Sequence, residues 1–210
     1  MTEIPALIAA FTTLFIIIDP FGLAPIFLAL TPGMTKAQRR AIAIRSCLIG
    51  AALMLAFLFL GATLLEFIGI SMPAFRIAGG VLLFLTALEM LFQKRQARRE
   101  DNASETAEEN DDDPSVFPLA MPLIVGPGAI TTIILLAGQA QGAADMIAIS
   151  AVMFAVLFTV FLAFLIAPLL EKLLGKTGIN ILTRLLGMLL AALAVQFILD
   201  GVSQSFGIGL

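Results

Sequence analysis

Two interruptions of apolar runs, one of them carrying a carboxylate, are the features of this sequence that point to chemistry. The first is Asp19-Pro20-Phe21-Gly22 and the second is Gly126-Pro127-Gly128. Proline lacks an N–H and glycine forms helix poorly, so each segment breaks a helix. In a lipid bilayer the freed backbone groups need partners, so such breaks lie against protein or a cavity. Two broken spans at corresponding positions of two halves indicate a transporter site.

The composition excludes most soluble and enzymatic classes. The chain of 210 residues is 60% hydrophobic and 13% charged, with a mean hydropathy of +1.06, whereas a soluble domain carries about 25% charged residues. We therefore expect one helical bundle in a membrane. There is no histidine and a single Cys47, which leaves no Ser–His or Cys–His centre and no His-rich or Cys-rich metal cluster. We expect no enzyme activity, cofactor, metal or nucleic-acid partner.

The elements that must position these breaks are apolar runs of membrane-spanning length. Thr35 and Ser71 are good helix N-caps before the second and third runs. Between the third and fourth runs, residues 93–116 hold four bases and eight acids, which predicts a disordered, solvated loop over 93–115. A second, short loop is predicted at 171–180. The six predicted spans are about 4–30, 41–65, 74–92, 116–137, 146–170 and 181–199.

The basic residues divide very unequally between the two sides that six spans create. Arg76 alone lies on one side. By the positive-inside rule the other side is cytoplasmic, which places both termini outside, as in a multi-pass protein of the bacterial inner membrane. The eleven bases of that side are Lys36, Arg39, Arg40, Arg45, Lys94, Arg95, Arg98, Arg99, Lys172, Lys176 and Arg184.

An internal repeat divides the chain into residues 1–92 and 116–210. The last span of each half begins with Arg-x-x-Gly, at Arg76 and Arg184, and the two breaks fall at similar offsets. Because three spans are an odd number, the halves enter the membrane from opposite sides. The predicted fold is therefore all-α, with six transmembrane helices in two inverted three-helix repeats, the first helix of each being broken.

Several motifs together resemble the MarC family of bacterial inner-membrane proteins. The resemblance implies six spans and a place among the LysE-type exporters. For some members it implies transport of small neutral amino acids such as glycine, alanine and serine with protons. The motifs are Asp19-Pro20, Gly69-Ile70-Ser71-Met72-Pro73, Arg76-Ile77-Ala78-Gly79-Gly80, Phe117-Pro118-Leu119-Ala120-Met121-Pro122, Gly126-Pro127-Gly128, Arg184-Leu185-Leu186-Gly187 and Gln196-Phe197-Ile198.

The breaks themselves supply the candidate binding groups. Asp19 is either a substrate or proton site or the cap of the following half-helix. The N–H groups after Gly22 and around Gly128 are suited to a substrate carboxylate. Thr131 and Thr132 bond the substrate or their own backbone. The substrate-binding residues expected from the sequence are Asp19, Pro20, Gly22, Gly126, Pro127, Gly128, Thr131 and Thr132.

Two arginines and one glutamate complete the set of candidates. Arg76 and Arg184 are expected either to anchor their spans at the membrane surface or to gate a carboxylate. Glu89 is expected to pair with a nearby base. The predicted function is a secondary transporter of small neutral amino acids, with possible proton coupling through Asp19. The alternatives are an exporter of another small metabolite, or a channel or non-transporting membrane protein.

Overall fold

The computed structural model describes residues 4–95, 97–99 and 113–207, and these form helices with no strand among them. Five helical segments are long and apolar enough to cross a membrane, with α1 and α2 counted together as one of them. The pair η1 and α6, bent by 61°, makes a sixth candidate span. The all-helical prediction is confirmed. The elements are α1 (Ile4–Ile18), α2 (Pro20–Ala29), α3 (Lys36–Ile68), α4 (Met72–Leu91), η1 (Ser115–Ile124), α6 (Pro127–Gly138), α7 (Ala143–Leu165) and α8 (Ala167–Phe206).

Local capping explains where α3 and α4 begin. Thr35 and Gln38 form a capping box at the start of α3, in which each side chain satisfies a backbone N–H of the other residue. Ser71 accepts a hydrogen bond from the N–H of Ala74 at the start of α4. Gly69, with φ 84°, ends α3 in the left-handed conformation that glycine tolerates. Both predicted caps are therefore confirmed.

Two predicted segments differ from the structure. The loop expected at 171–180 is helical, and α8 continues through it with one bend at Gly175, where φ is 59°. In the opposite sense, η1 is less regular than predicted, because Phe117 and Met121 adopt extended backbone angles. Each of these two residues precedes a proline, and the proline ring disfavours helical angles in the residue before it.

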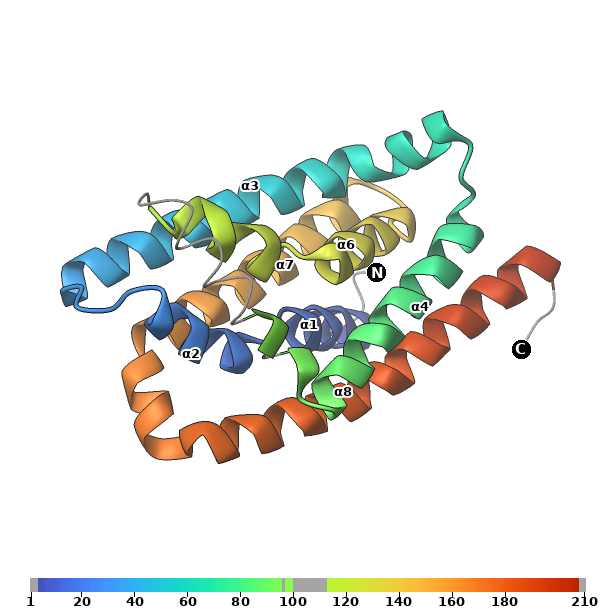
Figure 1. The fold of residues 1–210 in the computed structure, drawn as a ribbon. Helices are drawn as coiled ribbons and strands as arrows, with labels where there is room; N and C mark the ends of the chain where they lie inside the picture. Colours follow the sequence, from blue (N-terminus) through green and yellow to red (C-terminus); the bar gives the residue numbers. More distant parts are fainter. Residues whose placement is uncertain (1–3, 96, 100–112, 208–210) are drawn as a thin grey trace.

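Helices α4 and α8 pack together along most of the length of α4, and Figure 1 shows them side by side. They run antiparallel, since Gly80 lies against the carbonyl of Ala194 and Gly187 lies against Met90. A Cβ atom at Gly80 would stand 2.8 Å from that carbonyl oxygen. Small residues thus permit a close helix–helix contact.

The first broken span, α1 with α2, is the most enclosed of the candidate spans. It contacts α6, α7 and α8, and the ring of Phe27 stacks on that of Phe164 with a centroid separation of 4.4 Å. The start of α3 and the bend of α8 lie at one end of the bundle, opposite the α3–α4 connection and the C terminus (Figure 1). The first break is therefore held inside the protein, away from lipid.

Candidate functional site

The first break is a tight capping turn built by three of the predicted residues. Asp19 has φ 59° and ψ 68°, and its Oδ1 accepts a hydrogen bond of 3.1 Å from the N–H of Gly22. Pro20 occupies the first helical position of α2, where no N–H is needed. A Cβ at Gly22 would stand 2.2 Å from Asp19 Oδ2. The capping role considered for Asp19 is therefore present, and it requires glycine at position 22.

The carbonyls before this break receive hydrogen bonds from two arginines that the sequence did not assign to the site. In a continuous helix, Ile17 and Ile18 would accept from the N–H groups four residues later. Here Ile17 O accepts from Arg95 Nη2 at 2.5 Å, and Ile18 O accepts from Arg99 Nη2 at 3.2 Å. Arginine side chains thus replace the helix hydrogen bonds that the break removes.

These arginines reach the break because the chain reverses after α4. Gln93 has φ 60°, and the described residues 94, 95 and 97–99 are helical. Arg95 and Arg99 are only 7% and 6% exposed, so the prediction that the segment 93–115 is solvated throughout is wrong at its start. Residues 96 and 100–112 lie outside the described residues.

Arg99 also faces the carboxylate of the first break. Its Nη1 lies 3.5 Å from Asp19 Oδ2, and both side chains are more than nine-tenths buried. Neither of these two atoms makes a hydrogen bond within the described part of the chain. The pair is therefore an ion pair in which each partner retains an unused hydrogen-bonding atom.

The second break is open where the first is capped. Helix α6 begins at Pro127 after Gly126, and no side chain of the described residues caps its N terminus. The first N–H groups of any helix lack an intrahelical acceptor. A Cβ at Gly128 would stand 3.1 Å from Ile17 Cγ2 and from Leu83 Cδ2. Gly128 thus packs against Ile17, two residues before Asp19, so the two breaks lie side by side.

A cavity of about 480 Å³ lies at the second break. This volume is within the range of about 300–1,000 Å³ typical of small-molecule sites. Its charged lining consists of Glu89, Arg95, Arg98 and Arg99, and Gly126-Pro127-Gly128 forms part of its wall. The remaining lining residues are Ile17, Leu82, Leu85, Thr86, Pro122, Leu123, Ile124 and Ala129.

Glu89 pairs with a base, as expected. Its Oε1 accepts from Arg98 Nη1 at 2.5 Å. Its Oε2 is buried and makes no hydrogen bond to the described residues. The cavity is therefore lined by a guanidinium and a carboxylate that each have one polar atom without a hydrogen bond among the described residues: Arg99 Nη1, which faces Asp19, and Glu89 Oε2.

Several predicted site residues do not line this cavity. Asp19, Pro20 and Gly22 form the capping turn of the first break, which lies beside the cavity. The two threonines are buried elsewhere: a Cβ at Gly79 would stand 2.2 Å from Thr131 Cγ2, and Thr132 is 0% exposed. Thr132 Oγ1 makes no hydrogen bond among the described residues. Both threonines therefore lie in the buried interior, outside the lining of this cavity.

The two repeat arginines also lie outside the cavity lining. Arg76 is 5% exposed, and its Nε makes no hydrogen bond to the described residues. Arg184 is exposed, and its Nε and Nη2 donate at 3.2 and 3.1 Å when the Gln93 amide presents its oxygen. Arg184 thus contacts Gln93 in the turn after α4, from which Arg95 and Arg99 extend.

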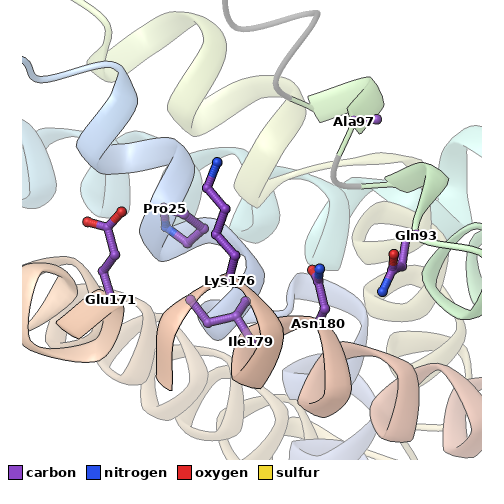
Figure 2. Close-up of a pocket in the computed structure, with 7 residues that line it drawn as sticks. All are labelled: Pro25, Gln93, Ala97, Glu171, Lys176, Ile179 and Asn180. Carbon is purple, nitrogen blue, oxygen red and sulfur yellow. The ribbon is translucent and has the colours of Figure 1, made fainter. Parts of the chain in front are cut away.

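A second hollow, of about 230 Å³, lies between α2 and the first part of α8. Figure 2 shows Pro25 of α2 above Ile179 of α8 and beside the side chain of Lys176, which extends upward from α8. The charged side chains that line this hollow, Glu171 and Lys176, are exposed to solvent. The cavity at the second break is the stronger candidate for a binding site, because two of its charged residues, Arg95 and Arg99, are buried.

The fold and this cavity define a polytopic helical membrane protein with charged groups enclosed between two interrupted spans. The model of the MarC family of integral membrane proteins matches residues 4–206. The chain belongs to the MarC family.

Similar proteins occur in archaea and bacteria. A UPF0056 membrane protein of Methanocaldococcus jannaschii is 36% identical over 195 residues, covering 93% of this chain and 95% of the relative. The UPF0056 membrane protein YvbG of Bacillus subtilis is 35% identical over 207 residues, covering 95% of each. YhcE of Escherichia coli is 32% identical over 206 residues, covering 97% and 95%. No solved structure matches the chain.

Proposed function

We propose that this protein is a secondary transporter that moves small neutral amino acids of the glycine, alanine and serine type across the inner membrane. The substrate would occupy the cavity at the second break. The observation that carries the proposal is a pair of buried polar atoms in the cavity residues that make no hydrogen bond among the described residues: Arg99 Nη1, which lies 3.5 Å from Asp19 Oδ2, and Glu89 Oε2. Buried polar groups without hydrogen bonds are costly, so sites that contain them are suited to a polar ligand.

The rest of the lining suits a small uncharged side chain. Leu82, Leu85, Leu123 and Ile124 provide apolar surface, and the break itself contributes glycine and proline. An acidic or basic substrate side chain would need a further partner, and the charged atoms near the cavity are already engaged in part by Ile17 O, Ile18 O and Asp19. This favours neutral amino acids.

Transport requires that the cavity open to each side in turn, and we propose that one three-helix repeat rocks against the other. The predicted inverted repeat, residues 1–92 and 116–210, supplies two related bodies for this motion. The antiparallel packing of α4 and α8, the last helices of the two halves, supports the proposal. The place among the LysE-type exporters that the resemblance implies is part of the same proposal. The unequal partition of bases supports both termini outside.

Proton coupling would act through Asp19. Protonation of this carboxylate removes the charge that faces Arg99 across 3.5 Å, and so weakens the attachment of residues 94–99 to the first break. Asp19→Asn retains an oxygen for the cap and removes the titratable charge. We expect this variant to exchange substrate down its gradient but to lose accumulation driven by a pH gradient. Accumulation equal to that of the parent would exclude Asp19 as the proton site.

The deciding experiment is uptake into proteoliposomes of radiolabelled glycine, alanine and serine, with and without an imposed pH gradient. Saturable uptake that the gradient increases supports the proposal. Saturable flux of another metabolite alone would favour an exporter of that metabolite. Single-channel conductance in a planar bilayer would favour a channel. Absence of both saturable flux and conductance would contradict transport altogether.

A further inference from the structure

The cavity presents two opposite charges that protein contacts only partly satisfy. Arg99 uses Nη2 on the carbonyl of Ile18, while its Nη1 faces Asp19 Oδ2 at 3.5 Å and makes no hydrogen bond among the described residues. Glu89 uses Oε1 on Arg98, while its Oε2 makes no hydrogen bond in the described part of the chain. Both residues line the same cavity. A ligand that carries both an anion and a cation would satisfy both atoms.

The N terminus of α6 adds a second anion-binding element beside Arg99. Helix α6 has 12 residues and no side-chain cap, and Gly126, Gly128 and Ala129 line the cavity. Uncapped N–H groups and the helix dipole favour a negative group at this position. Gly128 contacts Ile17, and the carbonyl of Ile17 accepts a hydrogen bond from Arg95. The N terminus of α6 and the helical turn that carries Arg95 and Arg99 therefore meet at Ile17.

We propose that this cavity binds the zwitterionic end of an α-amino acid, with the carboxylate at Arg99 and the α6 N terminus and the ammonium at Glu89. The inference rests on the proposed function, because it assigns the charged groups of the transported substrate to residues. Arginine donates to carboxylates through charge-assisted hydrogen bonds, and a carboxylate oxygen accepts from an ammonium.

The carboxylate that receives the substrate is therefore not the one that stands out in the sequence. Asp19, the carboxylate that stands out in the sequence, serves the break and the arginine segment, whereas Glu89, near the end of α4, receives the substrate ammonium. Arg95 and Arg99 are four residues apart, so they lie on one face of their helical turn. Arg95 secures that turn to Ile17, and Arg99 reaches the ligand.

The test is direct binding to the purified full chain in detergent by isothermal titration calorimetry. Three probes differ by one charged group: L-alanine carries both groups, L-alaninamide lacks the carboxylate and propionate lacks the ammonium. We expect alanine to bind wild type at least about tenfold more tightly than either truncated probe, since each loses a hydrogen bond to a charged partner.

Two variants then assign each charge to its residue. In Arg99→Gln the ratio of alaninamide to alanine affinity constants should approach one, while the ratio for propionate is retained. In Glu89→Gln the reverse should hold. Arg40→Gln is the matched control, because Arg40 is an exposed base on α3 away from the cavity, and both ratios should stay as in wild type. Elution of each variant as a single species in size exclusion establishes folding.

Equal binding of alanine and alaninamide to wild type would overturn the carboxylate assignment, even if no variant folds. If Arg99→Gln lost affinity for all three probes alike, Arg99 would have only a structural role, and the carboxylate assignment would be overturned as well. Failure of every probe to bind wild type would also overturn it. The proposed function can fail separately from this binding site. If the probes bind as predicted but alanine is not transported, the transporter proposal is rejected and the binding site is retained. If alanine is transported but its binding does not depend on Arg99, the transporter proposal is retained and the binding site is rejected.

Discussion

The two breaks use the same local device and end in opposite states. In each, a proline opens a half-helix inside a membrane span. At the first break, Asp19 caps the helix and two arginines satisfy the carbonyls. At the second, no side chain caps α6, and a cavity lies against its N terminus. The first break is thus completed by the protein's own groups, while at the second the N terminus of α6 faces a cavity, which is why we place the proposed substrate there.

The largest effect is expected from removing the carboxylate of the first break. Asp19→Ala deletes the α2 cap, which costs about 1 kcal/mol, and leaves Arg99 buried without its partner, which costs about 3–5 kcal/mol. The free energy of unfolding should therefore fall by about 4 kcal/mol or more, measured by denaturant titration in detergent micelles. Asp19→Asn, which keeps the cap, should lose less. Equal stability of the Ala variant and wild type would contradict the structural role given to this break.

A smaller loss of stability is expected from filling the space at Gly22. In Gly22→Ala the new methyl would meet the Asp19 carboxylate, which cannot move without losing the cap. Overpacking and the lost cap together predict about 2–4 kcal/mol. Gly142→Ala is the control, since no atom lies within 4 Å of a Cβ there. If both variants unfold at the same denaturant concentration, the tight turn is not what holds the first break.

Gly128→Ala should affect function more than stability, unlike the changes at the first break. The added methyl would stand 3.1 Å from the side-chain ends of Ile17 and Leu83, which can shift by a few tenths of an ångström. We expect a change in unfolding free energy of less than about 1 kcal/mol with a several-fold loss of alanine flux in proteoliposomes. Wild-type flux in this variant would separate the α6 N terminus from the substrate path.

The smallest effect is expected at Arg98, in the same segment as Arg99. Arg98 is 60% exposed and pairs with Glu89 near the surface, so Arg98→Gln should change stability by about 0.5 kcal/mol or less. Arg99→Gln should cost several times more in the same denaturant titration, because a buried charge pair is broken. Similar losses for the two variants would show that the burial of Arg99 does not matter.

The sequence was sufficient to locate both breaks and most helix boundaries, because proline, glycine and capping residues act locally. Pro20 and Gly126-Pro127-Gly128 disrupt helices wherever they stand, and Thr35 and Ser71 cap the helices that follow them. The apolar runs likewise predicted the spans, because their length and hydropathy are properties of the chain itself.

The groups that we propose bind the substrate could not be located in the same way. Arg95 and Arg99 are 78 and 81 residues from the carbonyls that they satisfy, so their burial depends on tertiary structure. Charged composition predicted solvent for the whole segment. The available signal was indirect: two arginines on one face of a turn, and carbonyls at a distant break that needed donors. The same reasoning explains Thr131 and Thr132, whose direction no local rule determines.

The most direct test of the account is whether substrate occupies the second break. In a Cys47→Ala background, Thr86→Cys places a thiol in the cavity lining, and Ala37→Cys places one on the exposed start of α3. Labelling rates with a small thiol reagent are measured as L-alanine is increased. We expect alanine to slow labelling at position 86 in a saturable manner and to leave labelling at position 37 unchanged. Unchanged labelling at position 86, at alanine concentrations that saturate uptake, would contradict it.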